Sequence, residues 1–372
     1  MSSRPAGRRS ATIVLTWALA ITLSACGGGG EDTAAEPTEI DPNADLSGQS
    51  IVVTNWAGYM PENITKIVKE ETGATVKVTN HATNEEMVAK VTGSGGEGLD
   101  VIFGSQPYLE AFAKEGLLEP INPEYLQNWD NLDPKAQELA QVDGQPYFLP
   151  YTWGTTGICY RSDLVDEAPD SWNDLLKPEE QYKNKITMMG TERWAVLPAQ
   201  KALGYSVNTT EPEEMAEVKE LMEQAKPHLL AYDDTTFYER LISCEAVMVE
   251  AWDGWCNYGR AEDPNIEFAV PKEGSDLWVD GMAILKSSEN KEAAYAFIDT
   301  ILDEENHAWA AENILYIVPN EAAMDSLPTK RTEQYPTIGA RREEMLQGEN
   351  MTDIGDEGAG LYNRIITEVT AS

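Results

Sequence analysis

Residues 50–80 read SIVVTNWAGYMPENITKIVKEETGATVKVTN, and this stretch decides the fold class. Residues 50–56 are rich in Ile and Val and predict a buried strand. Residues 61–71 predict a helix that has its apolar side chains on one face and ends at Gly73. Residues 74–78 predict a second strand. The order strand, helix, strand favours a parallel α/β sheet.

The same alternation continues along the rest of the chain. Further elements are predicted as helices over residues 85–91, 108–114, 212–225 and 289–302, and as strands over residues 99–104, 245–252 and 266–270. Ligands of parallel sheets bind beyond the carboxyl ends of the strands. Residues 55–59 and 105–108 are therefore the first candidates for a binding site.

The N-terminus has the features of an export signal. Arg4, Arg8 and Arg9 precede an apolar run over residues 11–23, which is too short to span a bilayer. The run leads to small residues and Cys26, a pattern that resembles the bacterial lipobox. We therefore expect residues 1–25 to be a lipoprotein signal peptide and Cys26 to carry a lipid. Residues 26–47, poor in large apolar side chains, are predicted to be a flexible tether.

The chain is strongly acidic, with a formal net charge of −37. Such a charge argues against nucleic-acid binding through phosphate contacts. The acidic residues are spread along the whole chain, which favours a solvated surface suited to a salty habitat. Steering of cationic ligands toward the protein is the other interpretation.

Three cysteines remain beyond Cys26, and an exported location permits disulfides. Cys244 and Cys256 are close in sequence and could pair, which would leave Cys159 free. The sequence alone leaves the connectivity open. Because the cysteine spacing matches no zinc motif, no metal and no cofactor are expected.

The sequence contains no organised catalytic set. His81, His228 and His307 lie in no metal-binding pattern, and all three are expected at the surface. Neither a nucleophile elbow nor a phosphate-binding loop occurs. Carboxylate pairs could serve a glycosidase, but among 64 acidic residues chance pairs carry little information. We therefore predict no catalytic residue and a protein that is not an enzyme.

Aromatic residues at predicted strand ends are the clearest functional signal. They are Trp56, Tyr59, Tyr108, Trp153, Trp252, Trp255 and Trp278. Aromatic faces attract cations, so this placement predicts a stacking pocket. Asp280 lies beside them in an apolar stretch, residues 277–285, and a buried carboxylate needs a partner. That partner could be a ligand ammonium or a backbone amide.

At these residues the chain resembles the spermidine/putrescine-binding proteins of polyamine ABC importers, which have the type 2 periplasmic binding protein fold. The matching segments keep the order and spacing of that family from about residue 48 to residue 365. They are residues 55–61, 84–90, 131–134, 150–156, 171–175, 203–206, 271–274, 278–280 and 318–320.

The resemblance implies two α/β lobes joined by a hinge, with the ligand in the cleft between them. It places residues 48–153 and 277–322 in lobe 1, and residues 154–276 and 323–372 in lobe 2. The resemblance also implies roles for individual residues. Trp56 and Tyr59 would supply aromatic contacts from lobe 1, and Ser105 a polar contact. Trp252 and Trp278 would line the methylene chain of the ligand, Asp280 would pair with an amine, and Tyr316 would be a cleft tyrosine.

The chain departs from this family at several cleft positions. Thr191 and Trp194 stand where the polyamine binders have two acids, although Glu192 could take over with a shift of one residue. Pro107 replaces a tyrosine and has Tyr108 next to it; Met351 replaces a glutamine. With Asp280 as the one clear carboxylate, the site is predicted to suit a single cationic group against aromatic faces.

These observations predict a lipid-anchored, extracytoplasmic solute-binding protein that delivers a polyamine or another small cationic amine to an ABC permease and its ATPase. We expect a monomer that contacts the membrane only through its lipid. The alternatives are a binder of neutral sugars or amino acids on the same fold, an extracellular hydrolase that uses a carboxylate pair, and a sensory receptor.

Overall fold

The computed structural model describes residues 36–371. The predicted signal peptide, Cys26 and the first part of the predicted tether lie outside these residues. The remainder of that tether contacts the body of the protein, because the N–H of Thr38 donates to Glu119 at 2.6 Å and Leu46 packs against the core. Among the described residues, no helix combines the length and the apolarity needed to cross a membrane.

The first lobe is built on a mixed sheet. Its described strands have the order β13-β12-β3-β1-β2, with β6 also paired to β12. β1 is parallel to β2 and β3, whereas β12 is antiparallel to β3 and β6. The strands are β1 Ser50–Asn55, β2 Thr75–Asn80, β3 Val101–Ser105, β6 Leu149–Gly154, β12 Asp276–Ile284 and β13 Glu349–Asn350. The predicted parallel pairing is confirmed for β1, β2 and β3. β12 is antiparallel to β3 because it enters from the other lobe in the opposite direction, although it is parallel to β13.

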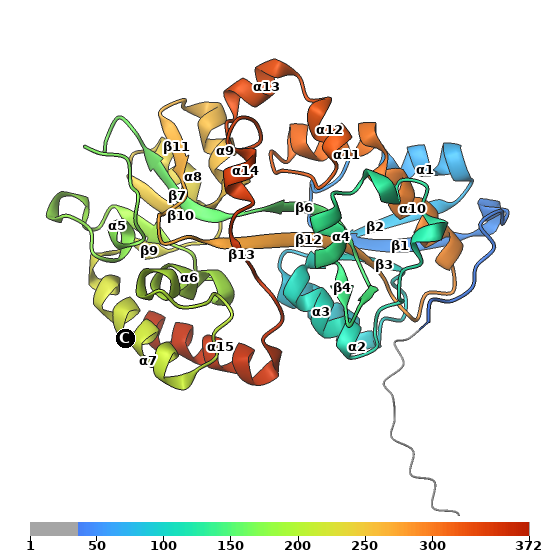
Figure 1. The fold of residues 1–372 in the computed structure, drawn as a ribbon, viewed down its shortest axis with the longest axis horizontal. Helices are drawn as coiled ribbons and strands as arrows, with labels where there is room; N and C mark the ends of the chain where they lie inside the picture. The colour runs from blue at the N-terminus through green and yellow to red at the C-terminus, as the bar shows by residue number, and fades with distance from the viewer. Residues whose placement is uncertain (1–35, 372) are drawn as a thin grey trace, which may run out of the picture. The chain divides into compact units, whose positions relative to one another are not determined.

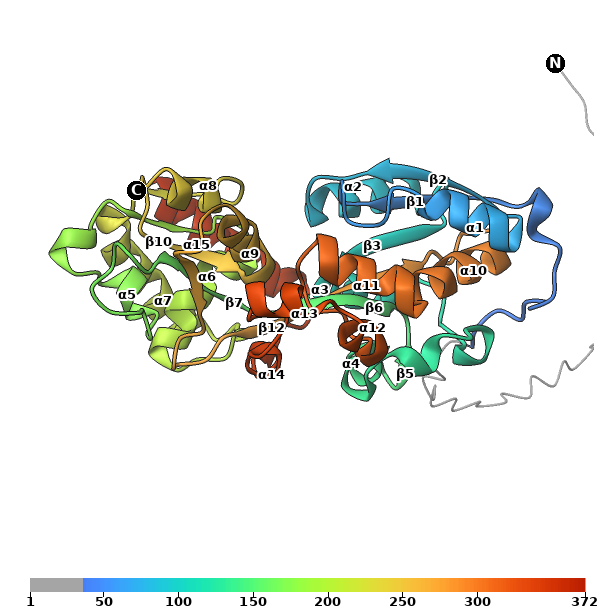
Figure 2. The same cartoon turned by 90° about the horizontal axis from the view of Figure 1, so that it is seen from above.

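Helices pack around this sheet (Figures 1 and 2). They are α1 Ile64–Thr72, α2 Asn84–Ser94, α3 Gln106–Lys114, α4 Pro134–Leu139, α10 Lys291–Leu302, α11 Glu304–Asn313 and α12 Glu321–Asp325. The start of α2 is well defined. Thr83 caps it by accepting the N–H of Glu86, and the Glu86 carboxylate accepts the N–H of Ala82. This capping holds the first turn of α2 at the end of β3.

The second lobe contains a separate sheet, with the described strands in the order β11-β7-β10-β8-β9. The strands are β7 Thr156–Arg161, β8 Ile186–Met188, β9 Ala231–Tyr232, β10 Met248–Trp252 and β11 Ile266–Ala269. The helices are α5 Asn173–Leu176, α6 Glu192–Leu203, α7 Pro212–Ala225, α8 Phe237–Ile242, α9 Asp253–Glu262 and α15 Gly355–Ala371, and α6 contacts both α7 and α15.

The chain passes between the two sheets along neighbouring strands (Figure 1). β6 in the first sheet is followed, after Thr155, by β7 in the second. β12 leads back, and Asp276 at its start accepts the N–H and the hydroxyl of Thr156 at 2.8 and 3.1 Å. α13 Thr329–Gln334 and α14 Arg342–Met345 precede the last passage, which reaches α15. The bonds between Thr156 and Asp276 join the two connecting strands, β7 and β12, between the sheets.

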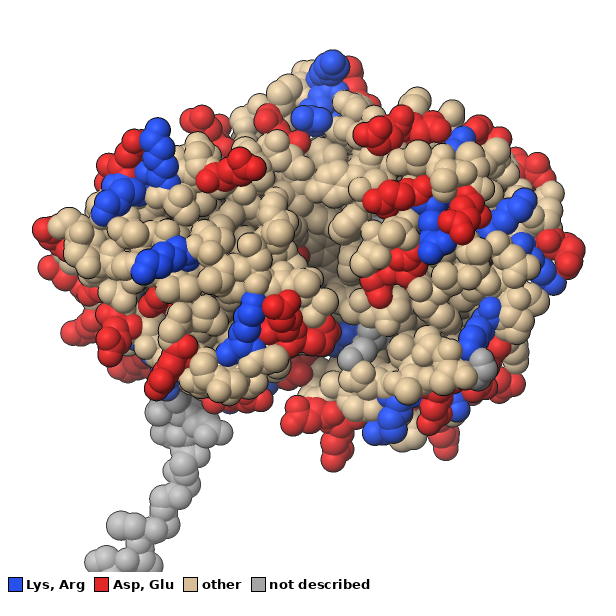
Figure 3. Space-filling view, turned by 180° about the vertical axis from the view of Figure 1, so that it is seen from behind, with Lys and Arg blue, Asp and Glu red and all other residues tan. Residues whose placement is uncertain are grey.

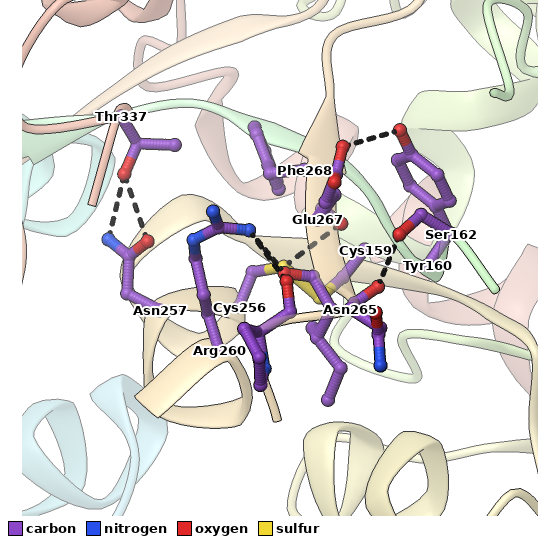
Figure 4. The surroundings of a disulfide bond; sticks show 12 residues. Cys159, Tyr160, Ser162, Cys256, Asn257, Arg260, Asn265, Glu267, Phe268 and Thr337 are labelled. Carbon is purple, nitrogen blue, oxygen red and sulfur yellow. Dashed lines mark hydrogen bonds between the residues drawn. A yellow bond between two sulfur atoms is a disulfide. The ribbon is translucent and has the colours of Figure 1, made fainter. Parts of the chain in front are cut away.

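The disulfide joins Cys159 and Cys256, not Cys244 and Cys256. Cys159 lies inside β7 and Cys256 lies in α9, which packs on that strand, so their Cα atoms are 5.6 Å apart (Figure 4). Cys244 is an exposed free thiol at the end of α8, where its sulfur accepts a hydrogen bond from Arg161 at 3.1 Å. Closeness in sequence was a poor guide, since the bonded cysteines are separated by 97 positions and are brought together only by the fold.

Two of the three histidines are buried, which contradicts the expectation that all would lie at the surface. His81 contacts the hydroxyl of Thr54 at 3.0 Å. His307 donates from Nε2 to the carbonyl of Tyr151 at 2.7 Å and stacks on its ring. Burial lowers the pKa of each imidazole to about 4. Both rings are therefore neutral packing residues at pH 7.

The disulfide is expected to stabilise the second lobe. Replacing Cys159 and Cys256 together by Ala should lower the free energy of unfolding by about 2–5 kcal/mol, because a long closed loop constrains the unfolded chain. Urea denaturation of the oxidised protein and the double variant measures this difference. Cys244→Ser is the matched control and should leave the midpoint nearly unchanged. An equal midpoint for the double variant would contradict the prediction.

Candidate functional site

A cavity of about 450 Å³ is lined by residues of both lobes. The space-filling view in Figure 3 shows the surface hollowed between them. The predicted cleft residues in its wall are Trp56, Tyr59, Ser105, Thr191, Trp194, Trp252, Trp278, Asp280 and Tyr316. Tyr108 lies outside the lining and donates its hydroxyl to Glu85, which does line the cavity, at 3.0 Å. Met351 is buried outside the lining.

The pairing of β12 with its neighbours sets the position of Asp280. In the antiparallel registers, Asp280 lies opposite Ser105 of β3 and opposite Thr152 of β6. The β6 register shifts between Asp280 and Gly281, which marks a β-bulge. Bulges re-aim side chains next to functional sites. The carboxylate thus emerges where β3 ends.

Short hydrogen bonds hold this carboxylate. Ser105 donates to Oδ1 at 2.6 Å and Tyr59 donates to Oδ2 at 2.8 Å. The single hydroxyl proton of Tyr59 is used in this bond, so Thr152 must be the donor in its 2.8 Å contact with Tyr59. Burial raises the pKa of Asp280 to about 6, against the two hydrogen bonds, which lower it. Asp280 is a fixed acceptor with lone pairs left for a ligand.

Aromatic rings make up much of the remaining wall. Trp56 meets Tyr59 edge to face, with the ring centroids 5.2 Å apart. Trp278 and Tyr316 form a second such pair at 4.8 Å. Trp252 and Trp194, from the second lobe, form a third at 5.3 Å. Edge-to-face pairs hold each other's orientation, so these rings form preorganised faces around the cavity.

Trp194 is fixed from behind the wall. Its indole Nε1 donates to Asp276 at 2.9 Å, and that carboxylate also accepts two bonds from Thr156. Trp194 therefore contributes a ring to the cavity, whereas its polar atom points to the strands that connect the lobes. Thr191 lines the cavity at the start of α6. The side chain of Glu192, the other candidate in this loop, lies outside the described part of the structure.

Two further carboxylates line the cavity, which corrects the expectation of Asp280 as the single clear one. Glu85 lies in the first turn of α2, and Asp234 lies in the loop after β9. Among the described lining residues none is Lys or Arg. The first-turn position of Glu85 could be read from the predicted helix. Asp234 had no such signal, because β9 is only two residues long and was not predicted.

Comparisons with known proteins agree with this architecture. The family model for bacterial extracellular solute-binding proteins matches residues 63–338. The spermidine/putrescine-binding periplasmic protein of Salmonella typhimurium is 30% identical over 321 residues, which cover 85% of this chain and 90% of that protein. The chain belongs to the bacterial extracellular solute-binding protein family.

Further relatives share the whole folded part. The putrescine/cadaverine-binding protein of Pseudomonas aeruginosa is 27% identical over 335 residues, which cover 87% of this chain and 94% of the relative. The crystal structure of the spermidine/putrescine ABC transporter substrate-binding protein of Streptococcus pneumoniae has a TM-score of 0.75 and 27% identity, and it covers 87% of this chain and 99% of its own. The two-lobed periplasmic binding protein fold is therefore established for this solute-binding protein.

A further acid lies behind the cavity wall of the solute-binding protein. Asp253, the first residue of α9, is fully buried, and neither carboxylate oxygen has a side-chain partner among the described residues. A Cβ on Gly154 would lie 2.4 Å from Asp253 Oδ1 and 2.5 Å from the ring of Trp278, so only glycine fits there. A Cβ on Gly254 would likewise lie 2.3 Å from the ring of Tyr316. Burial raises the pKa of Asp253 well above its ordinary value, because a buried carboxylate without side-chain donors is disfavoured.

The raised pKa of Asp253 predicts a pH-dependent effect on stability. In the unfolded chain this carboxyl ionises near pH 4, so folding above that pH must take up a proton. The destabilisation of the folded state by the buried carboxyl of Asp253 therefore grows as the pH rises. Asp253→Asn removes it and should raise the free energy of unfolding at pH 8 by on the order of 1–3 kcal/mol, with little change at pH 4.

Thermal melts at the two pH values measure this effect. Exposed Asp130 provides the control, because Asp130→Asn should produce no such pH-dependent difference. A lower melting temperature for Asp253→Asn than for the unaltered protein at pH 8 would show that the carboxylate is ionised and paired.

Proposed function

We propose that this solute-binding protein captures a polyamine or another small cationic amine for an ABC importer, with Asp280 as its counter-charge. The observation that carries the proposal is a hydrogen-bonded, half-buried carboxylate among aromatic faces, in a cavity whose described lining contains no Lys or Arg. An ammonium group can satisfy the lone pairs of Asp280 that Tyr59 and Ser105 leave open. The names of the relatives support an amine ligand.

The mechanism is capture without reaction. Ligand methylene groups lie against Trp252 and Trp278, and the ammonium group lies against Asp280 and the faces of nearby rings. The ligand then joins residues that belong to different lobes. Closure of the lobes excludes water and strengthens the charge pair, because screening is weaker in a drier site.

We propose that the lobe boundaries lie at residues 153/154, 276/277 and 322/323; the first two fall within one residue of the end of β6 and the start of β12. We further propose that a lipid on Cys26 tethers a monomer to the extracytoplasmic face of the membrane, where it delivers ligand to a permease and its ATPase.

The aromatic wall of the cavity also suits a second candidate ligand, a neutral sugar or amino acid. Such a ligand would bind with little dependence on Asp280 or on salt.

Asp280→Asn tests the counter-charge directly. It preserves the shape of the side chain and removes the charge, so binding of 1,4-diaminobutane should weaken by about 1–3 kcal/mol. Titration calorimetry measures the change. Asp130→Asn is the matched control, because Asp130 is exposed, and this variant should bind the diamine like the unaltered protein. Equal affinity for the Asp280 variant would remove this role.

The pKa of Asp280 predicts a pH dependence of binding. A cation prefers the ionised carboxylate, so the dissociation constant should be constant well above pH 6 and rise about tenfold per pH unit below it. Loss of the fold is not the cause, because a raised carboxyl pKa makes the ligand-free protein more stable as the pH falls from 6 toward 4. Calorimetry from pH 5 to pH 8 measures the curve, and Asp280→Asn should flatten it. A flat curve for the unaltered protein would contradict the assignment.

A further inference from the structure

Asp234 lies on the second-lobe side of the cavity. It comes from the loop after β9, and its Oδ1 accepts the N–H groups of Gly190 at 2.8 Å and Thr191 at 3.1 Å. The preceding N–H, of Met189, donates to Glu250 at 2.9 Å. Three successive backbone N–H groups, of residues 189–191, therefore donate to two carboxylates. These bonds fix the Asp234 carboxylate in the wall although no regular element carries it.

The second carboxylate oxygen of Asp234, Oδ2, lies beside Gly190. A Cβ on Gly190 would lie 2.9 Å from Oδ2, so the absence of a side chain at Gly190 leaves room for it. A carboxylate has about four acceptor directions, and the two backbone amides use those of Oδ1. Asp234 can thus accept further donors from the cavity that it lines.

The charge of Asp234 is not compensated by its surroundings. Among the described residues no Lys or Arg pairs with it, whereas its neighbour Asp233 pairs with Arg240 at 2.7 Å and does not line the cavity. Burial raises the pKa of Glu250 well above its ordinary value, and the charges of Asp234 and Asp276 add to this effect. Glu250 does not line the cavity, so the carboxylate that faces a ligand at this end is that of Asp234.

Asp234 and Asp280 face the same cavity from different lobes. Asp280 is held by Tyr59 and Ser105 in the first lobe, and Asp234 by the loop before α6 in the second. Without ligand, two like charges that approach as the lobes close oppose closure. One ammonium group can neutralise only one of them.

We infer that Asp234 is a second ammonium-binding residue, and that the ligand which closes the lobes carries two cationic groups, one for each lobe. This inference rests on the proposed function of amine capture. Asp234 approaches Thr191 through space from a loop 43 positions further along the chain, and it places a carboxylate beside that residue. A monoamine occupies the Asp280 end and leaves the Asp234 charge unpaired.

Glu85 is the other carboxylate of the wall and the natural control. It lies in the same lobe as Asp280, is exposed, and already accepts the hydroxyl of Tyr108. Solvent screens an exposed charge, so Glu85 should contribute little to discrimination between ligands. Asp234 is half-buried and should contribute more.

A ligand comparison combined with two variants tests the inference. Calorimetry at fixed low salt compares 1,4-diaminobutane with 1-aminobutane, which has the same chain and one ammonium group. The unaltered protein should bind the diamine about 10- to 100-fold more tightly. Asp234→Asn should remove most of that ratio by weakening the diamine alone, and Glu85→Gln should keep it.

The outcomes separate the two proposals. If Asp234→Asn keeps the ratio, or if Glu85→Gln abolishes it, the role of Asp234 is wrong and amine capture stands. If the unaltered protein binds neither amine, the proposed function itself fails. A melting temperature of Asp234→Asn within a few degrees of the unaltered protein shows that the variant is folded. If that variant unfolds, Asp234→Glu, which keeps the charge, should retain the preference for the diamine, and its loss would overturn the inference.

Discussion

The antiparallel pairing of β12 with β3 and β6 is the constraint on which the rest of the site depends. This strand enters the first sheet from the second lobe, and its register brings Asp280 opposite Ser105. A shift of one residue would turn Asp280 and Trp278 to the other face of the sheet. Asp276 at the start of the same strand bonds Thr156 and Trp194. One strand thus positions the counter-charge and fixes an aromatic wall residue of the opposite lobe.

Carboxyl groups in and behind this cavity are kept in different states by their surroundings. Asp253 and Glu250 are buried with few donors, and burial raises the pKa of both carboxyl groups well above their ordinary values, which disfavours their charged forms. Asp280 has two donors and a pKa of about 6, which leaves it largely ionised at pH 7. The negative potential that attracts a cation is therefore concentrated at acids that line the cavity. Acidic side chains scattered over the face shown in Figure 3 add a broad background that salt screens.

Much of the fold and part of the site could be predicted from local sequence. The strands and helices around residues 50–114 are short-range patterns, and they formed close to the predicted bounds. Trp56 and Trp252 stand at the ends of β1 and β10, a position that can be counted along the chain, whereas Trp194 lies in α6 and Trp278 lies inside β12. Errors arose where a contact joins distant segments. Cys159 meets Cys256 because α9 packs on β7. His81 and His307 are buried, and a hydroxyl or a carbonyl from another element bonds one nitrogen of each ring.

The sequence by itself determined the α/β class, most of the cleft aromatics and the need of Asp280 for a partner, because periodicity and the cost of burying a charge act on neighbouring residues. Only the tertiary structure decided what surrounds that carboxylate and how many acids share its cavity. Asp234 reaches the site through hydrogen bonds to the amides of Gly190 and Thr191, from a loop without periodic signal. Backbone amides are present at every residue except proline, so no side-chain pattern in the sequence marks which of them will hold a distant acid.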